Sequence, residues 1–320
     1  MADISSMAIT AIGLRKSYGE HTVLDGIDLT VAAGTVFSLL GPNGSGKTTT
    51  VRILTTLISA DGGEMWVGGH SVAGAGAAVR AAIGVTGQFS AVDKLLTGAE
   101  NLLLMGDLNH LPRSETRRRA TELLERFDLI DAAEKICSTY SGGMKRRLDL
   151  AMSLMGRPSI VFLDEPTTGL DPRSRRTMWQ IVRELVADGA TIFLTTQYLE
   201  EADQLADRVA VLDRGRLVAE GTPAELKRRV PGGYIRVRFP DADALDRGAR
   251  RLGAATRDDD ALALHVAGDG SAAEVKAILD RLFDDAIPVD TVSVHTPDLD
   301  DVFFALTGHA PSRNEEASAA

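Results

Sequence analysis

One short segment constrains this chain more than any other, because its residues fix both a backbone path and a ligand. It reads Gly-Pro-Asn-Gly-Ser-Gly-Lys-Thr at positions 41–48 and fits the pattern G-x-x-x-x-G-K-[ST]. Glycine lacks a Cβ, so a glycine-rich backbone can bend tightly and bring its N–H groups close to an anion. Residues 35–40 before it form an apolar run, and residues 48–57 after it have helical spacing. A buried strand followed by a helix is the context in which this pattern binds phosphate.

The side chains of the segment complete the interpretation as a phosphate loop. The helix that follows points its unpaired N–H groups and the positive end of its dipole at the same place. Lys47 adds a positive charge for the β- and γ-phosphates, and the Thr48 hydroxyl can bind Mg²⁺. We therefore expect a nucleotide site made of Gly41, Pro42, Asn43, Gly44, Ser45, Gly46, Lys47, Thr48 and Thr49.

Composition limits the class of protein around this loop. The chain has 320 residues, of which 44% are hydrophobic, so it can form about two domains with cores of their own. Its net charge of −10 argues against nucleic acid as a partner, because binding nucleic acid needs a basic face. A single cysteine, Cys137, permits no intramolecular disulfide. No run of 18 apolar residues occurs and residues 1–17 lack a signal-peptide pattern, so we expect a soluble protein of a reducing compartment.

The order of apolar patterns predicts an α/β fold with a helical insertion. Strands are expected at residues 8–14, 23–31, 35–40, within the turn-strand-turn segment 61–69, and at 82–88, 159–163, 191–195, 208–212 and 216–219. Residues 97–156 instead show helical spacing, with helices expected at 99–105, 113–127 and 144–155, and a further helix is expected at 174–188. Strands and helices that alternate around a phosphate loop indicate a largely parallel sheet. The first domain is expected to span residues 1–222.

A second, smaller unit is expected over residues 223–308. Residues 234–239 and 261–266 alternate with period two, as half-buried strands do. Helical patterns at 241–252, 272–283 and 299–306, with a strand at 291–294, complete a β-α-β-α-β-α order. This pattern predicts an α+β accessory domain. Residues 309–320 have the composition of a disordered tail.

Two carboxylates form a second candidate site at the end of a predicted strand. Asp164 and Glu165 follow the apolar run at residues 159–163, and the carboxyl ends of parallel strands are where ligands bind. An aspartate there can hold Mg²⁺ through water, and the adjacent glutamate can polarise a water for attack on the γ-phosphate. The alternative, a turn or helix cap, is disfavoured because the phosphate loop lies upstream in the same chain.

A third segment, Ser141-Gly142-Gly143, opens a predicted helix and offers another anion-binding geometry. One nucleotide needs only one phosphate loop, so a second such terminus suggests that another copy of the chain closes the site. These residues alone favour a simpler explanation, an ordinary serine-capped helix start.

Taken in order, these motifs resemble those of the ATP-binding subunit of an ABC transporter, over roughly residues 8–220. The resemblance implies that Tyr18 stacks on adenine and that Gln88 senses Mg²⁺ and the attacking water and reports to a membrane partner. It implies that Asp164 assists the metal and that Glu165 is the catalytic base. It also implies ATP and Mg²⁺ as ligands, and residues 1–222 as a P-loop ATPase domain with a mainly parallel sheet core, an antiparallel β subdomain and a helical insertion at about 97–156.

The same resemblance implies two partners. Ser141, Gly142 and Gly143 match the signature that contacts the γ-phosphate bound on a second copy, and Asp171 matches the loop that crosses the dimer interface. A head-to-tail dimer is thus expected, with an integral membrane permease as the other partner and no nucleic acid. The expected location is the cytoplasmic face of the cell membrane, with the surface at about residues 89–96 in contact with the permease.

Two positions depart from the family pattern. Met144 stands at the fourth signature position, where Gln is more usual. Gln197 stands where the family has its switch histidine, and a glutamine can donate a hydrogen bond to the γ-phosphate but cannot carry a proton or a positive charge. Hydrolysis is therefore expected to be slower or to depend more fully on Glu165, with Gln88 and Gln197 as the other catalytic residues.

Residues 85–93, 140–150 and 297–308 are similar to those of the daunorubicin-resistance branch, which exports hydrophobic drugs or antibiotics.

Two alternatives remain open at this point. One is an ABC ATPase that acts on ribosomes or DNA, although only one ATPase unit is present and no long coiled coil fits between the first two motifs. The other is a regulatory nucleotide-binding module with little turnover, which Gln197 favours and Glu165 and Gln88 oppose. A GTPase is disfavoured because no Asn-Lys-x-Asp motif occurs.

Overall fold

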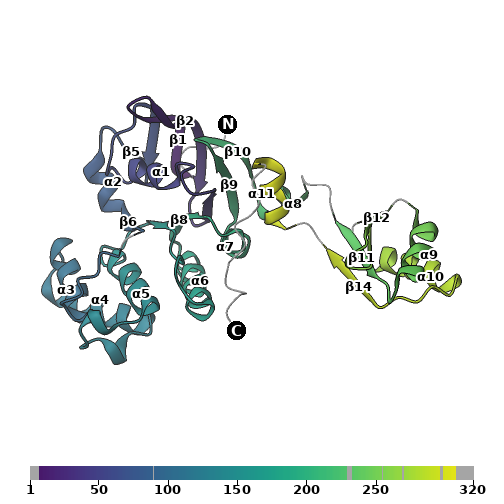
Figure 1. Ribbon diagram of the computed structural model, residues 1–320. Helices are drawn as coiled ribbons and strands as arrows, with labels where there is room; N and C mark the ends of the chain where they lie inside the picture. Colours follow the sequence, from purple (N-terminus) through teal and green to yellow (C-terminus); the bar gives the residue numbers. More distant parts are fainter. Residues whose placement is uncertain are drawn as a thin grey trace. The chain divides into compact units, whose positions relative to one another are not determined.

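A computed structural model describes residues 7–88, 90–228, 233–253, 255–268, 270–295 and 298–307. The chain divides into two compact units, Met1–Pro223 and Ala224–Ala320, and each is described by itself (Figure 1). The expected disordered tail at residues 309–320 lies outside the described residues, as do Phe89, Pro297 and Gly308.

A six-stranded sheet forms the centre of the first unit. Its order is β10-β9-β3-β8-β7-β6, and every neighbouring pair is parallel except β10 with β9. The strands are β3 (Val36–Leu40), β6 (Ile83–Thr86), β7 (Ile160–Asp164), β8 (Thr191–Thr196), β9 (Arg208–Asp213) and β10 (Arg216–Gly221). In β3, β7 and β8 every residue is buried, because helices cover both faces of the sheet.

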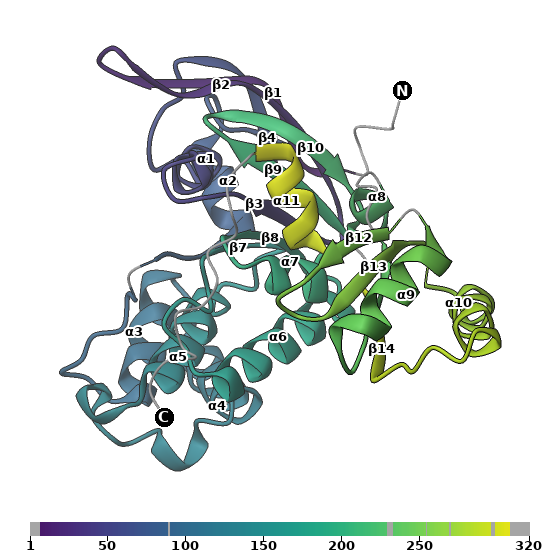
Figure 2. The ribbon, with the colours of Figure 1, turned by 45° about the vertical axis from the view of Figure 1, so that its right-hand side comes forward.

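The two faces of this sheet belong to different cores, and the alternation of side chains along each strand sorts the residues between them. Phe162 and Phe193 face the core that also contains Ile53 of α1 (Lys47–Leu54). Val161 and Leu194 face the core shared with α6 (Pro172–Ala187). Figure 2 shows α1 and α6 on opposite sides of the central strands. A helix on each face therefore fixes the loops that leave the carboxyl ends of the strands.

A second, antiparallel sheet of the first unit packs against the face that carries α1. Its order is β2-β1-β4-β5, from strands β1 (Met7–Tyr18), β2 (His21–Ala32), β4 (Gly62–Val67) and β5 (His70–Ser71). Buried residues of β1, β2 and β4 share one core with β3 and β7. This sheet and the parallel sheet, together with the helices, confirm the predicted fold class.

Three helices group apart from the sheets, within the stretch that helical spacing marked: α3 (Gly98–Leu108), α4 (Arg113–Arg126) and α5 (Gly142–Ser153) (Figure 1). Thr97 starts α3 with a capping box in which its hydroxyl accepts from the Glu100 N–H and the Glu100 carboxylate accepts from the Thr97 N–H. Short 3₁₀ turns at Ile130–Ala132 and Cys137–Thr139 lie between α4 and α5.

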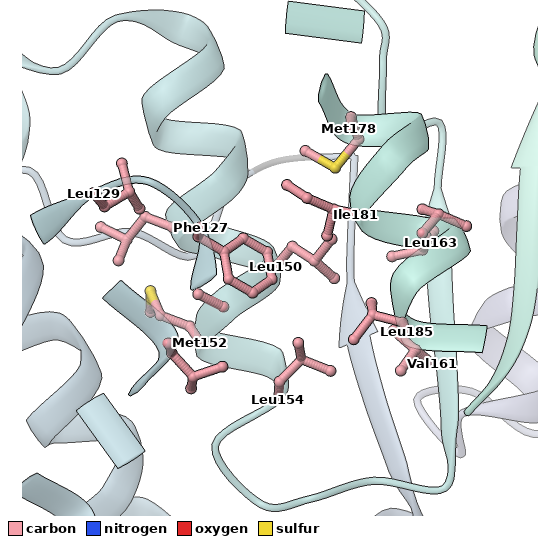
Figure 3. Packing of buried hydrophobic residues seen from close by; sticks show 14 of the residues in the cluster. Phe127, Leu129, Leu150, Met152, Leu154, Val161, Leu163, Met178, Ile181 and Leu185 are labelled. Carbon is pink, nitrogen blue, oxygen red and sulfur yellow. The ribbon is translucent and has the colours of Figure 1, made fainter. Parts of the chain in front are cut away.

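An apolar seam joins these helices to the central sheet. Figure 3 shows Phe127 and Leu150 from the helical region facing Ile181 of α6, with Leu163 of β7 alongside. Phe127, Leu150 and Leu163 are each no more than 1% exposed. Because Leu150 of α5 shares this core with Leu163 of β7, the position of α5 is tied to the strand that ends in the carboxylates described below.

The second unit contains a four-stranded antiparallel sheet of order β12-β13-β11-β14. Its elements are β11 (Tyr234–Arg238), α9 (Ala242–Leu252), β12 (Ala255–Asp258), β13 (Ala263–Ala267), α10 (Ala272–Asp284), β14 (Thr291–His295) and α11 (Leu299–Thr307). Helices α9 and α10 cover one face through Leu245, Leu252, Ile278 and Leu282.

The predicted β-α-β-α-β-α order was wrong by one strand. Strand β12 pairs with β13, but its sequence, Ala-Thr-Arg-Asp, has no apolar alternation, so only the partner strand reveals it. Helices α2 (Gly76–Ala82), α7 (Leu199–Leu205) and α8 (Pro223–Arg228) were also not predicted, since each is too short to show a period. Among the helices of the described ranges, none has both the length and the apolar character needed to cross a bilayer.

A fully buried acid lies where α7 meets α6. Glu201 has no exposed surface, and its Oε1 atom accepts a hydrogen bond of 3.1 Å from the Trp179 indole N–H. Burial raises the pKa of this carboxyl above its usual value, because removal from water disfavours the charged form.

The raised pKa of Glu201 predicts a pH-dependent cost to stability. An acid whose pKa is higher in the folded state supports folding fully below its unfolded pKa, near 4.5, and loses that contribution as pH rises through its folded pKa. We expect Glu201→Gln, which keeps an acceptor for Trp179, to gain stability relative to the wild type as pH rises above about 4.5. Thermal unfolding at several pH values measures the difference. Glu200→Gln, at an exposed neighbour, is the control, and the same pH dependence in all three proteins would contradict the expectation.

Candidate nucleotide-binding site

The phosphate loop at residues 41–48 connects β3 to α1 and is built around bare backbone. Gly46 has φ 112°, and a Cβ there would lie 2.6 Å from Leu24 Cδ2. A Cβ on Gly41 would lie 2.3 Å from the carbonyl oxygen of Leu212. Both positions therefore require glycine, one for its conformation and both for the close approach of neighbouring chain segments.

Lys47 begins α1 and folds back over the loop. Its Nζ atom donates to the carbonyl oxygens of Gly41 at 2.8 Å and Pro42 at 3.1 Å, and lies 3.4 Å from Glu165 Oε1. Burial lowers the pKa of Lys47, and the Glu165 carboxylate opposes that shift. The side chain is only 4% exposed, so its positive charge is held inside the loop where a phosphate would need it. Within the described ranges the buried Ser45 Oγ has no hydrogen-bond partner, which leaves a polar atom available in the same cradle.

Asp164 ends β7 beside the start of α1. Its Oδ1 atom accepts a hydrogen bond from the Thr48 hydroxyl at 3.3 Å and another from the Thr195 hydroxyl of β8. Thr48 and Asp164 thus present two oxygen ligands to one point, and Mg²⁺ prefers oxygen ligands. Sequence reasoning had placed Thr195 only in a strand. Its role depends on the pairing of β7 with β8, which no local motif records.

Glu165 follows Asp164 in a backbone conformation that is unusual for its residue type. Its φ of 49° lies in the left-handed region, which costs roughly 1–3 kcal/mol for a residue other than glycine. Its N–H donates to the Thr195 carbonyl oxygen at 3.1 Å, and the Thr168 hydroxyl donates to its Oε2 at 3.4 Å. Such strain collects at active sites, and here the strained residue has its carboxylate 3.4 Å from Lys47 Nζ.

The expected adenine-stacking, sensor and switch residues lie at the edges of this centre. Tyr18 ends β1 with a half-exposed ring, and the Lys16 Nζ lies 5.4 Å from the ring centroid. Gln88 is exposed and comes two residues after β6. Gln197 follows β8, beside Thr196, whose carbonyl oxygen accepts a hydrogen bond of 3.3 Å from the Gly41 N–H. This hydrogen bond attaches the start of the phosphate loop to the end of β8, next to Gln197.

The signature segment and Asp171 have structural partners of their own. Ser141 caps α5, because its Oγ accepts from the Met144 N–H at 3.2 Å, as the simpler interpretation expected. Asp171 caps α6 by accepting from the Ser174 N–H at 2.9 Å. Gly142 is exposed, and a Cβ on Gly143 would lie 2.6 Å from Ser174 Oγ. In the part of the chain that the structure describes, no hydrogen bond joins these segments to the phosphate loop.

A phosphate loop between β3 and α1, with an acidic strand end beside it, defines a P-loop nucleotide-binding protein. Comparison with known proteins gives the family. The family model for ABC transporters matches residues 24–168. The daunorubicin resistance ATP-binding protein DrrA2 of Streptomyces coeruleorubidus is 48% identical over 318 residues, covering 98% of this chain and 99% of that protein. The doxorubicin resistance ATP-binding protein DrrA of Mycobacterium tuberculosis is 44% identical over 313 residues, covering 94% of each.

A solved structure agrees with this likeness. A dimeric, post-hydrolysis ATP-binding cassette bound to ADP and Pi superimposes with a TM-score of 0.62 and 27% identity, covering 67% of this chain and 98% of that one. The chain belongs to the ABC transporter family and is an ABC ATPase, which confirms the family predicted from its motifs.

Substitution by alanine is expected to cause losses of different size at two glycines of the loop. At Gly46 the new Cβ meets Leu24 Cδ2 at 2.6 Å, whereas at Gly44, with φ 81°, nothing lies within 4 Å. We expect Gly46→Ala to weaken ATP binding more than about tenfold, since repacking the loop costs over about 1.4 kcal/mol. Gly44→Ala carries only the backbone strain and should bind more tightly than Gly46→Ala. Titration with a fluorescent ATP analogue measures both, and equal losses would contradict the steric argument.

Proposed function

We propose that this chain hydrolyses Mg²⁺-bound ATP to power a separate membrane permease that exports a hydrophobic drug or antibiotic. The observation that carries the proposal is the 3.4 Å approach of Glu165 Oε1 to Lys47 Nζ at the mouth of the phosphate loop. A base and a phosphate-binding cation are then adjacent. The cargo class is supported by the names of near-full-length relatives, which are daunorubicin and doxorubicin resistance proteins.

Hydrolysis assigns a distinct task to each residue of the centre. The loop N–H groups and Lys47 bind the β- and γ-phosphates, and Thr48 and Asp164 are placed to hold Mg²⁺. When bound, the metal neutralises charge on the phosphates. Glu165 accepts the proton of the attacking water, and Gln88 assists in placing that water. Before nucleotide binds, Lys47 pairs with Glu165, so phosphates that draw the ammonium group away also free the base.

Gln197 stands where the family usually has its switch histidine, and this changes which residues of the site can accept a proton. An amide can donate to the γ-phosphate, but it cannot take up a proton. Proton acceptance therefore falls on Glu165 alone. Removal of the Glu165 carboxylate therefore distinguishes the two hypotheses: it should abolish turnover in an ATPase, and should change little in a nucleotide-binding module that hardly turns over.

A second copy of the chain would complete the site. Ser141, Gly142 and Gly143 of one protomer would contact the γ-phosphate on its partner, with Asp171 at the interface. Such a contact is isologous and closes at two copies. Nucleotide that binds only the closed form drives closure by mass action. The dimeric state of the solved cassette that this chain resembles supports the arrangement. The exposed ring of Tyr18 would stack on the adenine.

The permease contact is assigned to the surface after Gln88, at residues 89–96, of which Phe89 lies outside the described residues. Leu95 is 83% exposed there, which suits a buried partner contact.

We assign residues 1–222 to the ATPase domain and 97–156 to its helical insertion. Residues 223–308 form an accessory domain, and the protein sits peripherally at the cytoplasmic face of the membrane.

Loss of the carboxylate at position 165 tests the catalytic assignment. A positioned general base contributes about 10²–10⁴-fold to rate, so Glu165→Gln should lower kcat by that factor and retain ATP binding. Glu64→Gln, at an exposed strand position, is the matched control. The measurements are phosphate release and nucleotide binding on the purified chain with its membrane partner. Turnover that survives in Glu165→Gln, or is absent from the wild type, would sink the hydrolytic mechanism.

Co-purification tests the transport assignment. We expect a tagged chain, expressed in its own host and extracted with mild detergent, to retain a multi-span membrane protein. The predicted contact surface at residues 89–96 is the physical reason for this expectation. Mass spectrometry identifies the partner. Recovery with ribosomes, or without any membrane protein, would favour an ABC ATPase that has no role in transport.

A further inference from the structure

A buried arginine on α5 reaches the backbone of both catalytic segments. The Arg146 Nε donates to the Pro166 carbonyl oxygen at 2.8 Å, and its Nη2 donates to those of Asp164 at 3.0 Å and Glu165 at 3.2 Å. Its Nη1 donates to the Gly87 carbonyl oxygen at 2.7 Å. One guanidinium group thus holds four carbonyl oxygens, three around Glu165 and one directly before Gln88.

Asp149, one turn further along α5, completes the link. Its Oδ2 lies 3.3 Å from Arg146 Nη1, and its Oδ1 accepts from the Ala91 N–H at 2.9 Å. Gly87 and Ala91 lie on either side of Gln88, so the ion pair is hydrogen-bonded to the Gln88 segment at two points, through Arg146 at Gly87 and through Asp149 at Ala91. Both side chains are at most 10% exposed.

We propose that Arg146 and Asp149 are a positioning pair that couples the Gln88 segment to the catalytic base during ATP hydrolysis. The proposal rests on the proposed function, in which Glu165 is the base and the Gln88 segment contacts the permease. A displacement of that segment would move the Gly87 carbonyl and the Ala91 N–H. The rigid guanidinium would then pass the displacement to the peptide groups around Glu165.

The geometry favours coupling over simple stabilisation. A buried ion pair is weak evidence for stability, because desolvation of the two charges offsets their attraction. The guanidinium donors form a planar fork with fixed directions, so their targets specify a geometry. Here the targets flank Glu165, whose φ of 49° needs surrounding bonds to hold it. The pair also sits on the helix that Ser141 begins, so the same element carries the signature segment.

Arg119 provides a matched control within the same unit. It is also partly buried and also donates through Nε and Nη2 to backbone carbonyl oxygens, those of Met155 and Leu154. Neither carbonyl belongs to the site. An Arg→Lys change at 119 removes the same fork geometry and the same packing without touching the segments of Glu165 or Gln88.

The test compares Arg146→Lys with Arg119→Lys in the assembled complex with the permease, measuring ATP hydrolysis and nucleotide affinity. Lysine keeps the charge but offers its donors from one point, so it cannot span both segments. We expect Arg146→Lys to lower kcat at least about tenfold while KM for ATP changes less than about threefold. Arg119→Lys should match the wild type. An unchanged kcat in Arg146→Lys, or a rise in KM alone, would overturn the proposal.

A second variant keeps the test decisive if Arg146→Lys does not fold. Asp149→Asn keeps an oxygen for the Ala91 N–H but removes the charge facing Arg146, so the same loss in kcat without loss of ATP binding is expected. Combined with Arg146→Lys, it should cost less than the two single losses added together, because the residues act as a unit. Independent effects, or failure of both variants to fold, assign the pair a structural role and overturn the proposal. A wild-type complex without ATPase activity would instead refute the proposed function.

Discussion

The site depends on the parallel register of three neighbouring strands. In that register Leu40 of β3 lies beside Thr196 of β8, and Asp164 of β7 lies beside Thr195. The carboxyl ends of the strands therefore meet at one edge, and the phosphate loop, the carboxylates and Gln197 all leave from it. Helices on both faces, together with the antiparallel sheet on one of them, bury every residue of these strands, so the loops leave from the buried centre of the unit.

Much of this could be predicted from the sequence because the chemistry of the site is local. The phosphate loop and the Asp164-Glu165 pair are short motifs whose spacing and flanking strand carry the interpretation, and continuous apolar runs identify β3, β7 and β8. What was missed depends on distant pairing. Strand β12 is recognised only beside β13, and Thr195 only once β7 and β8 are in register. In the sequence, Arg146 is an ordinary charged residue of a predicted helix. Its hydrogen-bond partner Gly87 lies 59 positions away, so no local motif shows the contact.

In the proposed dimer, a single protomer supplies half of each nucleotide site. Its phosphate loop already holds Lys47 against Glu165, whereas Ser141 and Asp171 serve as helix caps. In the proposed dimer, the exposed Gly142 and the N-terminal end of α5 would face the anion bound on the other chain. The structural role of Ser141 and its expected role at a dimer interface are therefore compatible, because the first uses its side chain to fix the helix start and the second uses the terminus thus formed.

Because Gln197 stands where the family has its switch histidine, the hydrogen bonds that hold the Glu165 backbone become more important. In the proposed mechanism Gln197 cannot share proton acceptance, so the rate would depend on how accurately the Glu165 carboxylate is held. Glu165 sits in a strained backbone conformation that neighbouring bonds must maintain. Those bonds come from Thr195 on one side and from Arg146 on the other. Because Arg146 also holds Gly87, the residue that steadies the base is attached to the segment expected to respond to the permease. Turnover and partner contact can then be linked through a single buried side chain, without a change of charge at position 197.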